Sequence, residues 1–445
     1  MRPSGRRPAA PFVLTGPPLP WRRPSIMWRH IYTGAMGSTY ANLVTGLFLV
    51  AYGGRLGVTY RAWGMLGGLV SFALLLQIVG AHLSSALGKR REVWFACAMT
   101  ERLLRGLAIA AAFYIAPMGP LITSAVFVVI LAASSAFGAM AAAPWYSWLA
   151  DLLPAEEQGR FWGRRDAWVS FVTAAVLVPC AVAYDEFRST DMHLPVLLTI
   201  FALALALGYV DLFIHRTIPE PPMAAGPKRS ILKEVVEVLR DRAFRPWLVF
   251  ICLWNFAMTL GASLAAVYFV ETLFERSLLF GILAASVVPL AMGVLTSRRM
   301  GALVDRFGAR TVLRFGHLIW TLVPLPWVFA TPATAVWLVA GSNILGMPAI
   351  NAATNAAIKY VTRFATSEKR AMYWAVSSSL ASLAGGLGAV VTGEALEFLR
   401  GWSVDVAGWT LSGFRAVFVA SIALRFVAAL FTWRLPAPPA EQAGR

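Results

Sequence analysis

The fold is decided by residues 278–330, which read LLFGILAASVVPLAMGVLTSRRMGALVDRFGARTVLRFGHLIWTLVPLPWVFA. Two apolar runs, 278–297 and 312–330, flank a short charged segment. A helix of about 20 apolar residues crosses a hydrocarbon core about 30 Å thick. Because no water is available inside lipid to pair with the backbone, each run is predicted to be a membrane-spanning helix.

The same pattern extends outward in both directions along the chain. Of its 445 residues, 58% are hydrophobic and only 14% are charged, whereas a soluble protein has about 25% charged residues. We therefore predict an all-α membrane protein with twelve transmembrane helices in two six-helix halves. The predicted spans are 31–52, 62–86, 93–116, 120–150, 167–186, 194–216, 246–272, 278–297, 312–330, 333–360, 372–394 and 413–434.

The chain divides at a Pro-rich, charged segment, residues 217–245, which separates an N-terminal half (31–216) from a C-terminal half (246–434). Apolar residues recur at helical spacing within 230–244, so we expect an amphipathic linker helix there. Residues 1–30 hold seven prolines and six arginines, which is typical of a disordered tail. A second possible start, Met27, lies where the ordered pattern begins, and residues 435–445 form a short second tail.

The basic residues fall mainly on one side of the predicted bundle. Most of the 39 Lys and Arg lie in the tails and in alternate loops. This asymmetry places both termini in the cytoplasm and the chain in the inner (plasma) membrane. The net charge of +17 is therefore explained by membrane topology, and we predict that the protein does not bind nucleic acid. The exceptions in the opposite loops are Arg55, Arg61, Arg188, Arg276 and Arg400.

Residues 301–310, Gly-Ala-Leu-Val-Asp-Arg-Phe-Gly-Ala-Arg, follow the eighth span. This segment resembles the signature cytoplasmic loop of the major facilitator superfamily, and the resemblance covers about residues 31–434. It implies a secondary transporter whose two halves rock about a central cavity. We predict a cytoplasmic gate in which Asp305 pairs with an arginine of the fifth helix and holds the outward-open state. The gate residues are Gly301, Asp305, Arg306, Gly308, Arg310, Arg160 and Arg164.

The sequence also departs from that family pattern. The first-half copy of the loop has Ser85 where the acidic residue is expected, and Gln158 replaces a residue that is often basic. The fourth span lacks the intramembrane arginine motif, and the fifth lacks the Gly-Pro motif, of the drug/proton antiporters. A drug/proton antiporter is therefore the less favoured alternative.

The resemblance implies that helices one, four, seven and ten line the cavity. Their polar residues share helical faces, and Trp145 and Trp148 add aromatic walls near the end of the fourth span. We predict a cavity of neutral hydrogen-bonding groups, against the alternative that these groups only join helices to one another. The candidates are Ser38, Asn42, Thr45, Trp145, Trp148, Asn255, Thr259, Ser263, Asn343, Asn351 and Asn355.

Charged residues inside the spans are the candidates for coupling. Glu101 and Arg105 are four residues apart in the third span and can pair, while Arg102 is expected to point elsewhere. Glu101 is the first candidate for a proton carrier, Asp151 the second, and Arg105 the partner of Glu101. A structural ion pair is the equal alternative, and two driving forces remain open: a proton gradient or the gradient of the solute itself.

The sequence lacks a phosphate-binding Gly-rich loop, a His-Glu-x-x-His motif and a Gly-x-Ser-x-Gly motif. Its cysteines, Cys97, Cys180 and Cys252, all fall in predicted spans. We therefore predict neither an enzyme nor a cofactor. The expected partners are the lipid bilayer and a small polar-uncharged or amphipathic solute, moved by a monomer. A non-transporting sensor on the same fold is the alternative from another class.

Overall fold

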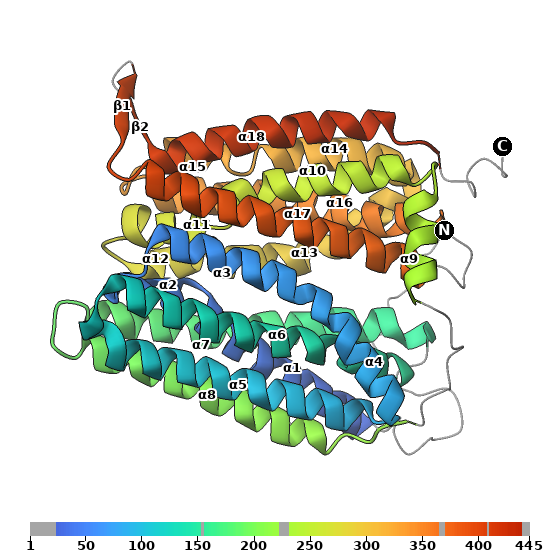
Figure 1. Ribbon diagram of the computed structural model, residues 1–445, viewed down its shortest axis with the longest axis horizontal. Coiled ribbons are helices and arrows are strands. Elements are labelled where there is room, and N and C mark those ends of the chain that lie inside the picture. The colour runs from blue at the N-terminus through green and yellow to red at the C-terminus, as the bar shows by residue number, and fades with distance from the viewer. Residues whose placement is uncertain (1–23, 153–154, 222–230, 365–369, 407–408, 438–445) are drawn as a thin grey trace, which may run out of the picture.

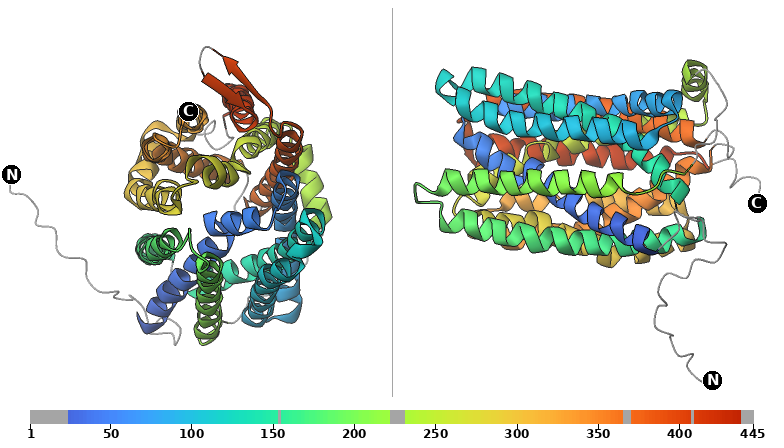
Figure 2. Two further views of the ribbon diagram at one scale, coloured as in Figure 1. Left: turned by 90° about the vertical axis from the view of Figure 1, so that its left-hand side faces the viewer. Right: turned by 90° about the horizontal axis from the view of Figure 1, so that it is seen from below.

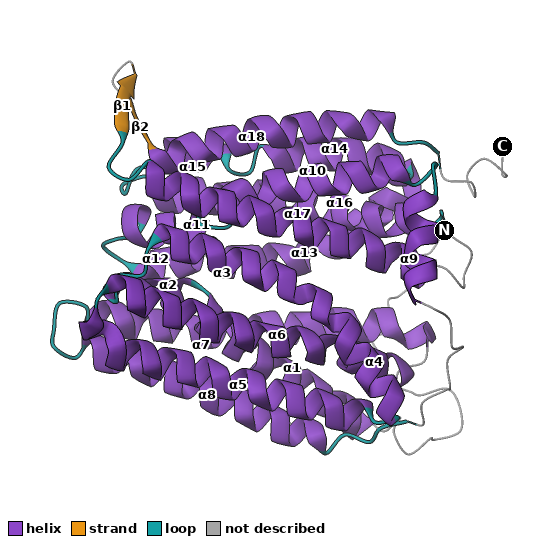
Figure 3. Ribbon diagram, in the orientation of Figure 1, coloured by secondary structure: helices purple, strands orange, loops and turns teal. Residues whose placement is uncertain are grey.

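The computed structural model describes residues 24–152, 155–221, 231–364, 370–406 and 409–437. Almost every described residue is helical (Figure 3). Besides loops and turns, the described residues form an antiparallel hairpin, β1 (Ser403–Val406) and β2 (Trp409–Ser412), with Ser403 opposite Ser412. The helices form two bundles that lie side by side, the N-terminal half below and the C-terminal half above in Figure 1.

The N-terminal half begins with a first span that bends at Gly46, where α1 gives way to α2. The second span contains a short 3-10 turn, η1, between α3 and α4, and another, η2, follows α5. The elements are α1 (Pro24–Thr45), α2 (Leu47–Arg55), α3 (Tyr60–Ala73), η1 (Leu74–Leu76), α4 (Gln77–Leu87), α5 (Arg90–Ile115), η2 (Ala116–Met118), α6 (Pro120–Leu152), α7 (Ala155–Glu186) and α8 (His193–Arg216).

The C-terminal half has the same number of spans, two of which contain a π-helical turn, η3 or η4. The linker helix α9 (Ile231–Arg240) precedes it, within the segment predicted to be helical. The remaining elements are α10 (Arg245–Ala262), α11 (Ala265–Tyr268), η3 (Phe269–Leu273), α12 (Leu278–Ile282), η4 (Leu283–Val287), α13 (Val288–Phe307), α14 (Ala309–Thr321), α15 (Leu325–Phe329), α16 (Ala335–Thr362), α17 (Arg370–Phe398), α18 (Gly413–Phe431) and η5 (Thr432–Arg434).

Eleven of the described helical segments are long and apolar enough to cross a membrane, and they match eleven of the predicted spans. The twelfth is α5, which is long enough but carries Glu101, Arg102 and Arg105 in its middle. It packs against α6 and α8 within the bundle. The twelve-helix architecture in two halves is therefore confirmed, and α5 is distinguished by charge, not by position.

Three boundaries differ from the predicted ones. Helix α1 starts at Pro24, so part of the predicted tail is helical. Helix α13 continues to Phe307, so the expected loop after the eighth span shrinks to a turn at Gly308, whose φ is +80°. Only glycine adopts such a φ at no steric cost, which explains the reversal there. The hairpin at 403–412 was not predicted.

The two ends of the bundle are distinct, and we name them by what they carry. The linker end holds α9 and the described chain ends, and the hairpin end holds β1 and β2 (Figure 1). Helix α9 packs against α17 and buries Val238 against the C-terminal half, and Asp241 just after it accepts a hydrogen bond of 2.7 Å from Tyr373. Helix α9 is thereby fixed to the C-terminal half.

The apolar core is shared between the halves at the hairpin end and divided at the linker end. One cluster joins Phe48 and Tyr184 of the N-terminal half to Phe269 and Leu278 of the C-terminal half. Toward the linker end, one cluster contains only residues 238–435 and another only residues 26–218. Burial therefore holds the halves together at the hairpin end, which faces the viewer in the left view of Figure 2.

Small residues bring α3 and α17 into close contact across the two halves. A Cβ on Gly64 would lie 2.5 Å from the Cα of Gly393, and a Cβ on Gly68 would lie 3.1 Å from the carbonyl oxygen of Gly386. Glycines of the second and eleventh spans thus form the two sides of one interface. Such interfaces let backbones approach closely where lipid gives no hydrophobic drive for association.

Candidate functional site

Side-chain hydrogen bonds between the halves gather at the hairpin end of the described structure. Asp185, at the end of α7, accepts hydrogen bonds from Ser277 Oγ (2.6 Å) and from the backbone nitrogens of Leu278 (2.8 Å) and Leu279 (3.0 Å). The carboxylate therefore binds the N-terminus of α12 in the other half, where the helix dipole favours negative charge. We call these four residues the hairpin-end latch.

Two further contacts add to the closure at this end. Tyr60 donates to Glu271 (2.9 Å), and Arg61 pairs with Glu394 (2.8 Å). The Arg61–Glu394 pair is half exposed, so screening by water limits its contribution. Closure at the hairpin end therefore depends more on the apolar cluster and the hairpin-end latch than on this ion pair.

A cavity of about 540 Å³ lies between the halves, and we call it the central cavity. Asn42 and Asn351, from the predicted set, both line it and face it from opposite halves. Asn351 donates to the Gly293 carbonyl oxygen and to Thr296. The remaining lining residues are Gly163, Asp166, Ser170, Ala285, Ser286, Pro289, Leu290, Gly293, Val294, Ser297 and Met347.

A second cavity of similar volume lies within the N-terminal half, and we call it the N-half cavity. Ser38 and Trp145, from the predicted set, line it. Helices α1 and α7 each contribute to both cavities, Ser38 and Val169 to this one and Asn42 and Ser170 to the central cavity. The other lining residues are Thr33, Gly34, Gly37, Ala41, Trp94, Ala98, Glu101, Arg102, Gly138, Ala141, Ala142, Tyr146, Trp162, Arg165, Val169, Asp211 and His215.

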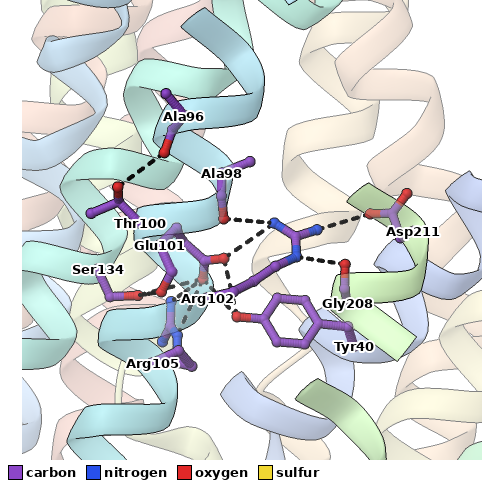
Figure 4. A network of polar contacts seen from close by, with 10 residues as sticks. All are labelled: Tyr40, Ala96, Ala98, Thr100, Glu101, Arg102, Arg105, Ser134, Gly208 and Asp211. Carbon is purple, nitrogen blue, oxygen red and sulfur yellow. Dashed lines mark hydrogen bonds and ion pairs between the residues drawn. The ribbon is translucent and has the colours of Figure 1, made fainter. Parts of the chain in front are cut away.

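A buried ion-pair network forms one wall of the N-half cavity (Figure 4). Glu101 pairs with Arg105 (3.2 Å), as the four-residue spacing predicted, and accepts 3.0 Å hydrogen bonds from Tyr40. Arg102, expected to point elsewhere, lies 3.4 Å from Glu101 and donates to Asp211 at 2.8 Å. These acids and arginines balance in charge, which lowers the cost of holding them at membrane depth.

Asp211 and His215, in the sixth span, were missed by the sequence analysis. They are four residues apart on α8 and lie 3.8 Å from each other. His215 accepts a hydrogen bond from the indole nitrogen of Trp145 and contacts Thr33 through Nδ1, both at 3.0 Å. An acid inside an otherwise apolar span was the signal that could have found them.

Several predicted cavity residues bond to backbone carbonyls instead. Thr259 bonds to Gly385 (2.7 Å) and so joins α10 to α17, and Asn343 bonds to Ala284 (3.1 Å). Asn255 and Thr45 bond four residues back in their own helices. None of these four residues lines either of the two cavities described above.

The other three candidates also lie away from the two cavities. Trp148 is fully buried and donates to the Pro219 carbonyl oxygen (3.0 Å). Ser263 holds a buried hydroxyl without a described partner, and Asn355 is half-buried on α16.

The predicted gate residues lie apart at the linker end. Asp305 pairs with Lys359 of its own half at 2.7 Å, while the guanidinium of Arg164 lies over the ring of Trp28. Arg306 lies over Phe307, and the Nε of Arg310 is buried without a described partner. Gly301 has open space around its Cα, and Gly308 forms the turn. The side chains of Arg160 and Asp151 lie outside the described part of the structure.

The fold and the cavity between its halves define a polytopic membrane transporter. The chain belongs to the Major Facilitator Superfamily, whose family model matches residues 31–389. It is therefore a secondary transporter and not an enzyme, and members of this family bind small molecules within the membrane.

Solved transporters share the fold at low sequence identity. A mutant form of the nucleoside transporter NupG aligns with a TM-score of 0.68 and 14% identity, covering 92% of this chain and 99% of that one. The inward-open xylose transporter XylE from E. coli gives 0.63 and 18%, covering 94% and 97%. An inward-facing, occupied bacterial homologue of the human lysosomal transporter Spinster gives 0.63 and 15%, covering 94% and 97%. No curated protein matches the sequence.

Proposed function

We propose that this secondary transporter moves a small polar-uncharged or amphipathic solute across the plasma membrane by alternating access. The observation that carries the proposal is the central cavity, lined from both halves, combined with closure at the hairpin end. With both termini in the cytoplasm, as the basic residues indicate, this conformation faces inward. The differential binding of solute to the two open states would then shift their populations.

Apart from Asp166, the described lining of the central cavity is uncharged, which supports a solute without multiple negative charges. Asn42, Ser170, Ser286, Ser297 and Asn351 offer amides and hydroxyls to the central cavity. In addition, the amide nitrogen of Asn351 is already bonded, which leaves its oxygen as the acceptor for a solute donor. A multivalent anion would instead require several convergent cations.

The proposal includes coupling to protons through Glu101. Its carboxylate lines the N-half cavity, is buried, and receives donors from Tyr40 and Arg105. Protonation would remove the charge that holds both groups and would free Arg102 and Arg105 to change partners. This rearrangement supplies a physical link between proton binding and the packing of α1 against α5 and α8.

A thermal-shift screen followed by counterflow in liposomes tests the proposal. Purified protein is heated with sugars, polyols, amino acids, nucleosides and lipophilic cations, and a ligand at 100 times its Kd adds about 2.7 kcal/mol of stability. The hits are then tested for exchange across the liposome membrane. Exchange supports transport, whereas stabilisation without any exchange would favour a sensor and reject the proposal. Hits confined to lipophilic cations would favour a drug/proton antiporter.

A further inference from the structure

The N-half cavity contains one cation whose charge is poorly matched by the protein. Arg165, on α7, lines this cavity, and its side chain is only 14% exposed. Its nearest described acid is Asp166, with Nη1 and Oδ1 3.5 Å apart. Charge-assisted hydrogen bonds are about 2.7–2.9 Å long, so this contact is too long to satisfy the guanidinium.

Asp166 is also in the wrong place to neutralise Arg165 fully. Its side chain is 60% exposed and lines the central cavity, whereas Arg165 lines the N-half cavity. Water therefore screens much of its charge. The Nε of Arg165 is buried and has no hydrogen-bond partner among the described residues.

The acids that share the N-half cavity are already occupied. Glu101 accepts from Tyr40, Arg102 and Arg105, and Asp211 accepts from Arg102 at 2.8 Å. Both carboxylates therefore already accept hydrogen bonds within their own network. No described hydrogen bond joins Arg165 to that network. The cavity thus presents an arginine with spare donors beside a network that is satisfied.

Arg165 is also held in a fixed position, as a binding group requires. Its guanidinium carbon lies 5.4 Å from the ring centre of Trp145 and 5.3 Å from that of Trp162, within cation–π range. Gly34 of α1 packs closely against the guanidinium, since a Cβ there would lie 2.5 Å from Nη2. Trp145 is itself fixed by its hydrogen bond to His215.

We propose that Arg165 binds the carboxylate of an amphipathic solute whose apolar, aromatic body lies against Trp94, Trp145 and Trp162. The planar guanidinium matches a carboxylate through paired hydrogen bonds. Indole rings offer large contact areas to an aromatic body. This inference rests on the proposed transport function and narrows its solute class to amphipathic monocarboxylates.

The test compares naphthoate with naphthamide, which have the same shape and differ in charge. Isothermal titration calorimetry is performed on the full chain in phosphatidylcholine nanodiscs. We expect naphthoate to bind the native chain roughly tenfold more tightly than naphthamide, as expected for one charge-assisted contact. Arg165→Gln should abolish this preference, and Arg165→Lys should retain part of it.

The matched control is Arg216→Gln, which removes a half-exposed arginine that lies over Phe95 and lines neither cavity. It should leave the preference for naphthoate unchanged. A merely structural Arg165 would alter stability without altering this preference. The inference is overturned if the native chain binds both probes equally, binds neither, or if Arg165→Gln keeps the preference.

Two further comparisons distinguish this inference from the binding of a lipid headgroup and from the transport proposal. In nanodiscs that contain phosphatidylglycerol, loss of naphthoate binding would mean that a lipid headgroup occupies the site and would overturn the solute assignment. Counterflow is measured separately in liposomes. Naphthoate preference without any counterflow would reject the transport proposal alone, and counterflow of neutral solutes without the preference would reject this inference alone.

Discussion

At the residue scale, the Arg102–Asp211 pair is the contact whose loss should cost most. Both side chains are at least nine-tenths buried and lie 2.8 Å apart. Removing one partner of such a pair leaves an uncompensated charge, which costs about 3–5 kcal/mol. We therefore expect Asp211→Asn to lower the Tm by several degrees in a fluorescence melt. Asp191→Asn, in an exposed loop, is the control and should change little.

A double variant tests whether the loss of stability in Asp211→Asn comes from leaving Arg102 without its partner. Asp211→Asn combined with Arg102→Gln removes both charges, so it should be more stable than Asp211→Asn alone. Equal or lower stability of the double variant would contradict the assigned pairing.

Glu101 allows a test of coupling at the same scale. Glu101→Gln removes the carboxylate charge but keeps a side chain of the same shape toward Tyr40 and Arg105. We expect solute counterflow to continue while uptake driven by a pH gradient falls at least tenfold. Both are measured in the same liposome preparation, with Glu92→Gln, near the linker end, as the control. Retained pH-driven uptake would exclude Glu101 as the proton carrier.

At the element scale, the interface of α3 with α17 should not tolerate added volume. Gly64→Ala would push a methyl group to 2.5 Å from the Cα of Gly393, where the neighbour is backbone and cannot rotate away. Overpacking of this kind costs about 1–3 kcal/mol. We expect a clear fall in Tm for Gly64→Ala and none for Gly163→Ala, whose Cβ would meet open space. Equal melting of the two variants would contradict this close approach.

The elements themselves were predictable because helix length in a membrane is set by bilayer thickness. The span 413–434 was predicted with the same limits as the observed segment, Gly413–Arg434. The hairpin was missed because Ser403–Ser412 is short, although its Val404, Val406 and Leu411 alternate with polar residues about a two-residue connection. Helix α5 was predicted despite its charges, because the remaining residues of its run are apolar.

The site was less predictable, because a helical face in sequence does not say what it faces. Asn42 and Thr259 looked equivalent, yet one lines the central cavity and the other binds the Gly385 carbonyl oxygen. Arg165 was passed over in favour of its neighbours, Arg160 and Arg164. Its position between two tryptophans depends on residues of α6 and α7 that only folding brings together.

At the scale of the whole molecule, the proposed alternating access requires contacts at opposite ends to set the balance between open states. The hairpin-end latch favours the observed state through three short hydrogen bonds to Asp185. Asp305→Asn tests the opposite end, where we predict that Asp305 pairs with an arginine of α7 in the outward-open state. Asp305 binds Lys359 here, and because its replacement would remove the predicted pairing of the outward-open state, labelling from the outer face should fall. Unchanged labelling would reject this gate.

Asp185→Ala should shift the population in the other direction. Hydrogen bonds to a charged group contribute about 1.5–3 kcal/mol each, so even a net loss of about 2 kcal/mol would change the ratio of states roughly thirtyfold. The reporter is Ser286→Cys in the central cavity, with Cys97, Cys180 and Cys252 replaced by alanine. Labelling by an impermeant thiol reagent from the hairpin end should rise.

Ser277→Ala separates the hairpin-end latch from a general loss of stability. It removes only the 2.6 Å contact and leaves the backbone bonds from Leu278 and Leu279 to Asp185. Its labelling should therefore fall between those of the reporter background and Asp185→Ala, while its Tm stays close to that of the background. If both variants label like the background, closure at the hairpin end depends on the shared apolar cluster, and the transporter changes state by separating that cluster alone.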